Sequence, residues 1–434
     1  MKKVSKIGAV VIVGTMVFVR SVFASGLDLL VNTLAEKGII SYGEAQQLSV
    51  DIKEEIKKQI AKGELDTIPR WVQNLSLRGD IRLRYQTDWA AGAAEDRKRA
   101  RLRLRLGAET RLVENVKAGF GLATGVSYGT TNPTLHIPST GTYTIPVSVD
   151  IVDKEPRSTN YTFGDSLSKG LFFVDYGFIE YSPFEWFKAT LGKFRNPIWQ
   201  TTDIIWDTDL NHEGIALNFD YKFTPDLGIF LVPEMMIIDE RSTGVDPIMY
   251  AVQPGVNWGI NEDIKLKLGV AYYVFNGVKG NTLDHSANTN ARSGGRYTME
   301  YNTLNPSLSL DVKGVPFVET TSVFGDYVLN SSTDTNNVGY CAGIRVGASR
   351  INEFGQWSLR YLYRYLERDA FVDVFPDSDS YGGRTNSFGS EIIFEMGLTK
   401  NTLLSIDYYT TDVIKGQTNT TPRSLIQVDF VTRF

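Results

Sequence analysis

Residues 77–85 read LRGDIRLRY, and residues 99–106 read RARLRLRL. In both stretches apolar and charged side chains alternate along the chain. Successive side chains of a β-strand point to opposite faces, so each stretch would carry one apolar wall and one charged wall. These two stretches therefore predict β-strands that lie between an apolar and a polar environment.

The same alternation recurs along the chain. It returns in residues 215–221 (IALNFDY), in residues 264–268 (IKLKL) and in residues 357–368, where Trp357, Leu359, Tyr361, Tyr363 and Tyr365 alternate with Arg360, Arg364 and Arg368. Short turns are expected at 114–115, 182–185, 224–226, 261–263, 313–314, 352–355 and 399–401. Longer polar loops are expected at 87–97, 127–169, 195–211, 240–246, 276–299, 330–336, 368–385 and 412–421.

Fifteen connections imply about 16 strands. An even number of strands, with short turns at one end and long loops at the other, is the layout of outer-membrane barrels. The predicted fold class is all-β: a transmembrane antiparallel β-barrel of about 16 strands with a short N-terminal periplasmic α-helical segment. A closed barrel leaves no unpaired edge, which suits a chain whose single cysteine, Cys341, can form no internal disulfide.

The chain begins with a targeting pattern. Lys2, Lys3 and Lys6 precede an uncharged run over residues 7–19, and small residues flank a cleavage site after Ala24. The pattern predicts a signal peptide over residues 1–24, although Arg20 leaves the exact cut open. A membrane anchor is the alternative, but the run is too short to span a bilayer comfortably.

Residues 25–70 are expected to form a periplasmic helical segment and linker, followed by the barrel over residues 71–434. Ser41 and Glu44 have the spacing of a capping box, which satisfies backbone N–H groups in the first turn of a helix. Leu48, Ile52, Ile56 and Ile60 follow as one apolar stripe on a charged helix over residues 27–62. The stripe would pack either within the chain, on residues 27–34 or the barrel mouth, or in a short coiled coil with sister chains.

The composition argues against other function classes. The formal charge of −5 would become more negative on removal of residues 1–24, so nucleic acid is a poor partner. The three histidines, His136, His212 and His285, lack metal-ligand spacing, and no Gly-rich phosphate loop is present. We expect no enzyme activity, no catalytic residue, no metal and no cofactor.

The chain resembles the putative-porin family of bacterial outer membranes. The likeness lies in residues 34–41 (LAEKGIIS), in residues 77–85 and 97–105, and less sharply in residues 191–193 and 213–215. The final strand, residues 426–434, ends in Phe434 and resembles the insertion signal that the barrel-insertion machinery reads. The family resemblance implies a pore-forming protein in the lipid of the outer membrane, with a homotrimer as the candidate assembly.

Alternation also predicts which charges line the pore. The basic residues expected to face the lumen are Arg78, Arg82, Arg84, Arg99, Arg101, Arg103, Arg105, Arg360 and Arg364. Asp80 and Glu109 join them, whereas Ile81, Leu83, Leu102, Leu104 and Leu106 should face lipid. An arginine on the lipid face at mid-membrane costs about 2–4 kcal/mol, which several residues per hairpin could not sustain. The arginines would either act directly on passing ions or pair with acids and brace the wall.

A constriction is expected from one of the outer loops. The loop at 195–211 carries Asp203, Asp207 and Asp209 with Trp199 and Trp206. By resemblance to general porins, it would fold into the barrel and narrow it. Counting strands places its base across the barrel from the first hairpin, so its acids would set a transverse electric field against the arginines. The alternatives are a solvated surface loop, or constriction by the 127–169 loop with its Asp150, Asp153 and Glu155.

The expected function is that of a porin, a water-filled channel for passive diffusion and ion transport of small hydrophilic solutes across the bacterial outer membrane. The alternative is a structural barrel that tethers the envelope through its N-terminal helix.

Overall fold

A computed structural model describes residues 41, 43–44, 46–48, 50–51, 54, 58, 69–125, 127–131, 134–137, 141–144, 149–164, 170–414 and 422–434. Contacts divide the chain into two compact units, residues 1–74 and residues 75–434. The expected signal peptide lies outside the described residues.

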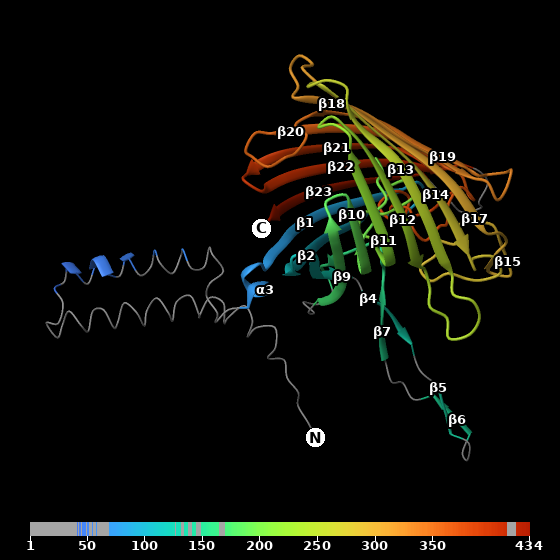
Figure 1. The fold of residues 1–434 in the computed structure, drawn as a ribbon. Coiled ribbons are helices and arrows are strands. Elements are labelled where there is room, and N and C mark those ends of the chain that lie inside the picture. The colour runs from blue at the N-terminus through green and yellow to red at the C-terminus, as the bar shows by residue number, and fades with distance from the viewer. Residues whose placement is uncertain are drawn as a thin grey trace. The chain divides into compact units, whose positions relative to one another are not determined.

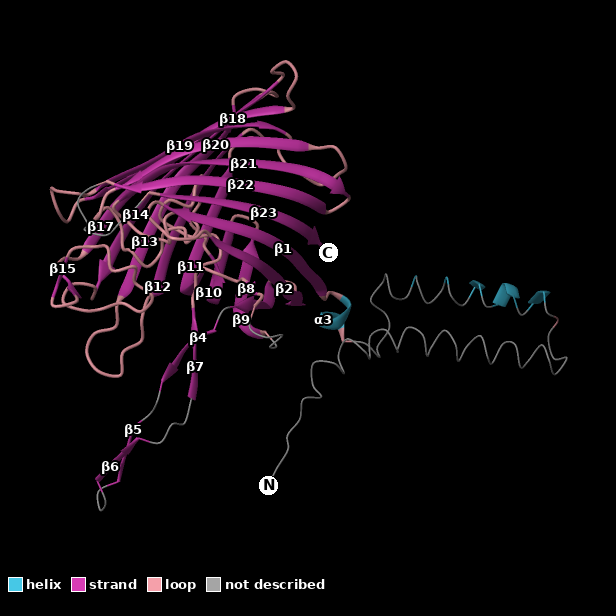
Figure 2. Cartoon of the chain, turned by 180° about the vertical axis from the view of Figure 1, so that it is seen from behind, coloured by secondary structure: helices cyan, strands magenta, loops and turns pink. Residues whose placement is uncertain are grey.

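The second unit is a closed antiparallel barrel of sixteen long strands (Figures 1 and 2). Each strand pairs with the next along the chain, and the last pairs with the first through the register Leu83↔Phe430, which closes the barrel. The strands are β1 (Ser76–Ala90), β2 (Arg97–Val113), β3 (Val116–Gly125), β9 (Leu171–Phe184), β10 (Phe187–Arg195), β11 (Asn211–Lys222), β12 (Leu227–Ile237), β13 (Ile248–Gly259), β14 (Ile264–Asn276), β17 (Tyr301–Lys313), β18 (Thr320–Asn330), β19 (Val338–Gly347), β20 (Trp357–Leu366), β21 (Ser387–Thr399), β22 (Thr402–Val413) and β23 (Arg423–Arg433). The predicted fold class is confirmed.

Short strands lie in the connections. β4 (Ser127–Thr131) pairs with β7 (Val149–Lys154), and β5 (Thr134–Ile137) pairs with β6 (Gly141–Thr144). β8 (Tyr161–Thr162) pairs with β2, and β15 (Arg292–Ser293) pairs with β16 (Arg296–Tyr297). The turn expected at 313–314 is longer, since β17 ends at Lys313 and β18 begins at Thr320.

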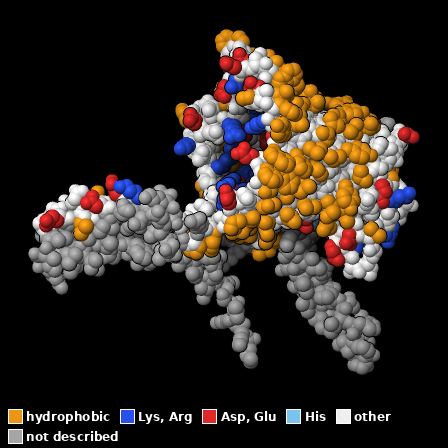
Figure 3. All heavy atoms as spheres, viewed as in Figure 1, with side chains coloured by type: hydrophobic (Ala, Val, Ile, Leu, Met, Phe, Trp, Pro, Cys, Tyr) orange, Lys and Arg blue, Asp and Glu red, His pale blue; other side chains and the backbone are white. Residues whose placement is uncertain are grey.

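Alternation separates the two faces of the barrel wall. On β1, Leu83 is 49% exposed whereas its neighbour Arg84 is 5% exposed. Figure 3 shows apolar side chains over the outer strands, with charged side chains gathered in the opening beside them. The outer face is thus suited to hydrocarbon and the inner face to polar groups and water.

The sequence favours girdles at the membrane interfaces for six aromatic residues, Tyr176, Phe178, Tyr181, Trp258, Tyr272 and Tyr408. Two of them, Tyr176 and Phe178, lie on the inner face instead. Tyr176 and Phe178 of β9 pack over Gly119 and Gly121 of β3, and Tyr176 also covers Gly107 of β2. A Cβ at Gly107 would lie 2.0 Å from the Tyr176 hydroxyl, and one at Gly121 would lie 2.1 Å from its ring. The missing side chains make the room that the aromatic rings occupy, and this packing overrides the simple girdle interpretation.

Loops fill part of the barrel interior. Residues 196–210 follow β10, residues 277–300 follow β14 and residues 367–386 follow β20. They contribute Trp206, Val278, Phe371 and Phe375 to one buried apolar cluster that includes Tyr273 of the barrel wall. The loop expected at 368–385 therefore holds a core, where the sequence predicted only a polar connection.

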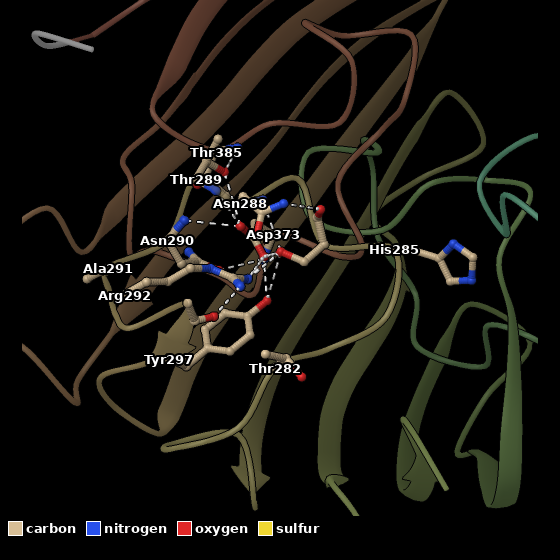
Figure 4. A network of polar contacts seen from close by, with 12 residues as sticks. Thr282, His285, Asn288, Thr289, Asn290, Ala291, Arg292, Tyr297, Asp373 and Thr385 are labelled. Atoms are coloured by element: carbon tan, nitrogen blue, oxygen red, sulfur yellow. Dashed lines mark hydrogen bonds and ion pairs between the residues drawn. The ribbon is translucent and has the colours of Figure 1, made fainter. Parts of the chain in front are cut away.

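A carboxylate fastens two of these loops together (Figure 4). The Asp373 side chain is fully buried and accepts hydrogen bonds from the hydroxyls of Tyr297 at 2.5 Å and Ser286 at 2.7 Å. It also accepts from the backbone N–H groups of Thr289 at 2.6 Å and Asn290 at 3.1 Å. A buried charge needs such partners, so Asp373 holds residues 286–297 against residues 367–386.

The described part of the first unit is helical. The expected capping box is present: Glu44 donates its backbone N–H to Ser41 Oγ at 3.2 Å, and Ser41 donates its backbone N–H to Glu44 Oε2 at 2.8 Å. Leu48 is 40% exposed, whereas Ile52, Ile56 and Ile60 lie outside the described residues. The short helix α3 (Arg70–Gln73) follows. Among the described residues, no helix combines the length and apolar character needed to cross a membrane.

The lipid-facing assignment makes a depth-dependent prediction. Leu83→Arg would place a charge in the middle of the outer face and should lower the free energy of unfolding by about 2–4 kcal/mol. Leu77→Arg, near the end of the same strand and on the same face, should lower it by about 0–1 kcal/mol. Urea titration of the protein folded in lipid vesicles measures both. Equal losses would contradict the assignment of faces or depth.

The Asp373 network predicts a local change. Asp373→Ala would leave several buried donors unpaired and should destabilise the two loops by on the order of 3 kcal/mol. Hydrogen exchange should rise in residues 277–300 and 367–386 while the strands stay protected. Asp334→Ala, at an exposed loop position, should change neither. Unchanged exchange in the Asp373 variant would show that the network does not hold the loops.

Candidate functional site

The inner wall of the first hairpin carries a block of four arginines. Arg84 lies directly opposite Arg101, and Arg82 lies directly opposite Arg103. Arg84 and Arg101 are buried. Like charges directly opposite one another on paired strands repel, so this block requires nearby acids.

Acids from distant parts of the chain supply that compensation. Asp429 of β23 accepts two hydrogen bonds from Arg84, both at 2.7 Å, and lies 3.6 Å from Arg82. Asp379, from the loop after β20, accepts a third from Arg84 at 3.0 Å. Asp80 of β1 accepts from Arg103 at 2.8 Å, so the block is an ion-pair network that joins adjacent strands of the wall to a loop.

The other arginines predicted for the first hairpin also pair with acids. Arg105 binds Asp80 at 2.7 Å, Arg99 binds Asp88 at 3.0 Å, and Arg78, which is largely exposed, binds Glu109 at 2.9 Å. These contacts show that the arginines pair with acids and brace the wall, which is one of the two roles expected for them. Their effect on ion passage remains a prediction.

The two arginines predicted on β20 have different surroundings. Arg364 is buried against three carboxylates, those of Asp203 at 3.0 Å, Asp377 at 3.1 Å and Glu391. Arg360 faces the same side of β20 and lies over the ring of Phe324, 4.8 Å from its centroid. Arg364 is therefore compensated by carboxylates, whereas Arg360 contacts an aromatic ring.

All three predicted loop acids lie within the barrel network. Asp203 binds Arg364, and Asp209 lies 3.5 Å from Arg105 and accepts from Thr159. Asp207 is buried and accepts from the backbone N–H of Ser378 at 2.8 Å. Burial raises the pKa of Asp207, and the nearby charge of Asp209 raises it further.

The placement of this loop differs from expectation in one respect. Its base at β10 lies four strands from β1 through β2, β3 and β9, so it is not opposite the first hairpin. The loop nevertheless reaches Arg105 because it crosses the interior. Trp206 packs in the apolar cluster, and Trp199 lies under the Lys267 ammonium at 4.5 Å.

The segment before β8 enters the lumen too. Asn160 accepts from Arg82 at 2.7 Å, and buried Arg157 donates to the Gly383 carbonyl at 3.2 Å. The side chains of Asp150 and Asp153 lie outside the described part of the structure. Three segments thus share the interior of the barrel: residues 155–162, 196–210 and 367–386. The sequence favoured a single constricting loop, either 195–211 or 127–169.

Sequence reasoning missed several residues of this network. Asp429 could have been found, since it alternates with the outward Val428 and Phe430 on the final strand. Asp377, Asp379 and the segment around Asn160 carry no periodic signal, because they lie in irregular chain.

Two cavities are lined by these charges: Arg84 lines the first, and its partner Asp379 lines the second. The first, of about 450 Å³, is lined by six arginines and four acids: Arg82, Arg84, Arg103, Arg345, Arg360 and Arg433 with Asp311, Glu395, Asp407 and Asp429. The second, of about 220 Å³, is lined by five arginines and three acids: Arg97, Arg99, Arg101, Arg157 and Arg423 with Asp88, Glu155 and Asp379. Arginine outnumbers acid in the lining of both cavities, although the chain as a whole is acidic.

The remaining reactive groups lie apart from these cavities. His212, the second residue of β11, is buried, and its Nδ1 lies 2.6 Å from Glu234 Oε1 beneath the Trp206 ring. Cys341 is buried in β19. Within the described residues, no three His, Cys, Asp or Glu side chains are arranged to hold a metal ion.

Solved porin structures resemble this fold at low identity. OprB of Pseudomonas putida aligns with a TM-score of 0.53 and 10% identity, covering 83% of this chain and 94% of that chain. OmpF of Salmonella typhi, in complex with daunomycin, aligns with a TM-score of 0.46 and 9% identity over 83% and 97%. A triple mutant of the Rhodopseudomonas blastica porin aligns with 0.42 and 11% over 83% and 100%. The likeness in fold rests on the first of these.

Comparison with curated protein sequences gives no match. The family described as putative porin, by contrast, matches residues 45–95, 151–309 and 312–434, which is more than half of the chain. With the closed sixteen-stranded barrel and its charged interior, this match assigns the chain to a family of outer-membrane channels: the chain belongs to the putative-porin family.

Proposed function

We propose that this porin lets small hydrophilic solutes and ions diffuse passively across the bacterial outer membrane, with a preference for anions. The observation that carries the proposal is the contrast between the apolar outer face and two arginine-rich cavities within the barrel. Charges that line a lumen tune the selectivity of a barrel.

The inner loops support a narrow channel. A barrel of 16 strands is wide enough for an aqueous channel, but residues 196–210 and 367–386 occupy part of its interior. The path left beside the basic wall would favour small solutes over large ones. Anions would concentrate there, because charges confined in a lumen are screened less than exposed charges separated by more than a Debye length.

The maturation and assembly of the protein are part of the proposal. Cleavage after Ala24 would release residues 25–434 to the periplasm, and Phe434 would end the strand that the insertion machinery reads. Phe434 is 57% exposed on the second unit, which leaves its ring accessible. The barrel would then function as a homotrimer, as the family resemblance implies.

Single-channel recording tests the channel directly. The purified protein in a planar bilayer should give discrete current steps in potassium chloride, because water-accessible cavities flank the inner loops. Folded protein can be verified by its β-rich circular dichroism and heat-dependent gel migration. Folded, inserted protein that carries no current would contradict the channel and favour the structural tether.

The basic wall predicts the sign of ion selectivity. Replacing Arg101, Arg103 and Arg105 with Gln should shift the reversal potential in a salt gradient toward cation preference, since three lumen charges are lost. The shift should shrink near 1 M salt, where the Debye length falls to about 3 Å. Replacing Lys222, Lys313 and Lys400 with Gln removes the same charge from exposed positions at the short turns and should shift it less. Equal shifts would contradict a special role for the first hairpin.

A further inference from the structure

A second pair of arginines lies on another wall of the larger cavity. Arg345 of β19 and Arg360 of β20 are direct cross-strand partners. Their neighbours Ile344 and Tyr361 are 43% and 44% exposed on the outer face, so both arginines face inward and line the 450 Å³ cavity. Like charges in this arrangement repel unless negative charge lies nearby.

This pair lacks the counterions that compensate the first hairpin. Among the residues that the structure describes, no carboxylate oxygen lies within 4.0 Å of a nitrogen of Arg345 or Arg360. Arg364, four residues further along β20, instead has three carboxylates. Arg364 is thus held in direct ion pairs, whereas Arg360 acts on the Glu391 carboxylate only at longer range.

The acids of the same cavity have other partners or lie apart. Asp429 binds Arg84, Asp311 accepts from Ser322 at 2.5 Å, and Glu395 accepts from Ser358 at 3.3 Å. Asp407 is the fourth acid of the cavity, and its Oδ1 is buried without a hydrogen-bond partner. None of these four acids is in ion-pair contact with the Arg345–Arg360 pair.

Few of the N–H donors of the pair have a hydrogen-bond partner in the protein. Each guanidinium has five, and Arg345 makes two long contacts, to Ser322 Oγ and the Ser349 carbonyl, both at 3.4 Å. Arg360 Nε is buried without a hydrogen-bond partner. The Phe324 ring under Arg360 orients that guanidinium without using its in-plane donors.

We propose that Arg345 and Arg360 form a binding site for a small oxyanion, the carboxylate or phosphate group of a solute in transit. The proposal rests on the channel function proposed above and adds a solute class to it. Two planar guanidinium groups match the oxygens of such a group through charge-assisted hydrogen bonds. A site made of two guanidinium groups on one wall of the 450 Å³ cavity suits weak binding, which conduction requires.

Inorganic phosphate is the first probe, and succinate is the second. In a planar bilayer carrying chloride current, wild-type channels should be blocked by one or both in a saturable manner. The double variant R345Q/R360Q should raise the half-blocking concentration by about tenfold, because the charge-assisted bonds to both guanidinium groups are lost. Arg350→Gln removes an exposed charge at the neighbouring turn and should leave it unchanged.

Three results would overturn the site while leaving the channel intact: chloride current that neither anion blocks, an unchanged half-blocking concentration in the double variant, or an equal effect of Arg350→Gln. Absence of wild-type current would contradict the channel itself. Calorimetric titration of the detergent-solubilised protein with phosphate and succinate then tests the site independently of current. Binding that disappears in the double variant supports it, and absence of wild-type heat with both anions overturns it.

Discussion

The cost of placing arginine against hydrocarbon determines the arrangement of this protein. Strand alternation forces each side chain to one face, and a shift of one residue would send the whole set to the other face. With Leu83 outside and Arg84 inside, the register Leu83↔Leu102 and Arg84↔Arg101 follows from a single constraint. The same register closes the barrel through Leu83↔Phe430.

That constraint creates a second one. Arginines driven to the inner face of two adjacent strands lie opposite one another, and their repulsion must be compensated inside the barrel. Asp429 supplies part of this from the closing strand, and Asp379 supplies part from a loop. The ion pairs thus link the wall to the loops, while the apolar cluster around Phe371 and the Asp373 network hold the loop in place. The arginines of the wall and the loops that fill the lumen therefore depend on each other.

This coupling explains what the sequence could and could not predict. Alternation is a local pattern, so neighbours such as Leu83 and Arg84 reveal which face of the wall each side chain occupies. The polar breaks between alternating stretches reveal the number of strands and most of the short turns. The partners of those arginines depend on contacts between positions as far apart as Arg84 and Asp429, which local patterns do not encode. Phe371 and Phe375 lie in irregular chain with neither helical nor strand periodicity, so nothing distinguished their loop from a solvated one. Tyr176 was misplaced because the deciding feature, the room above Gly107 and Gly121, comes from neighbouring strands.

The ion-pair network also separates two kinds of lumen arginine. A guanidinium such as that of Arg364, surrounded by three carboxylates, has its donors and charge used within the protein. Its removal would leave buried carboxylates unpaired, so it would alter folding as well as selectivity. A guanidinium such as that of Arg360 contributes charge to the cavity without that obligation. The number of inward arginines therefore overstates the positive charge available to a passing solute. That available charge is better measured by the arginines that remain without an ion pair inside the protein. By that measure the wall formed by β19 and β20 is a stronger candidate for contact with anions than the more basic first hairpin.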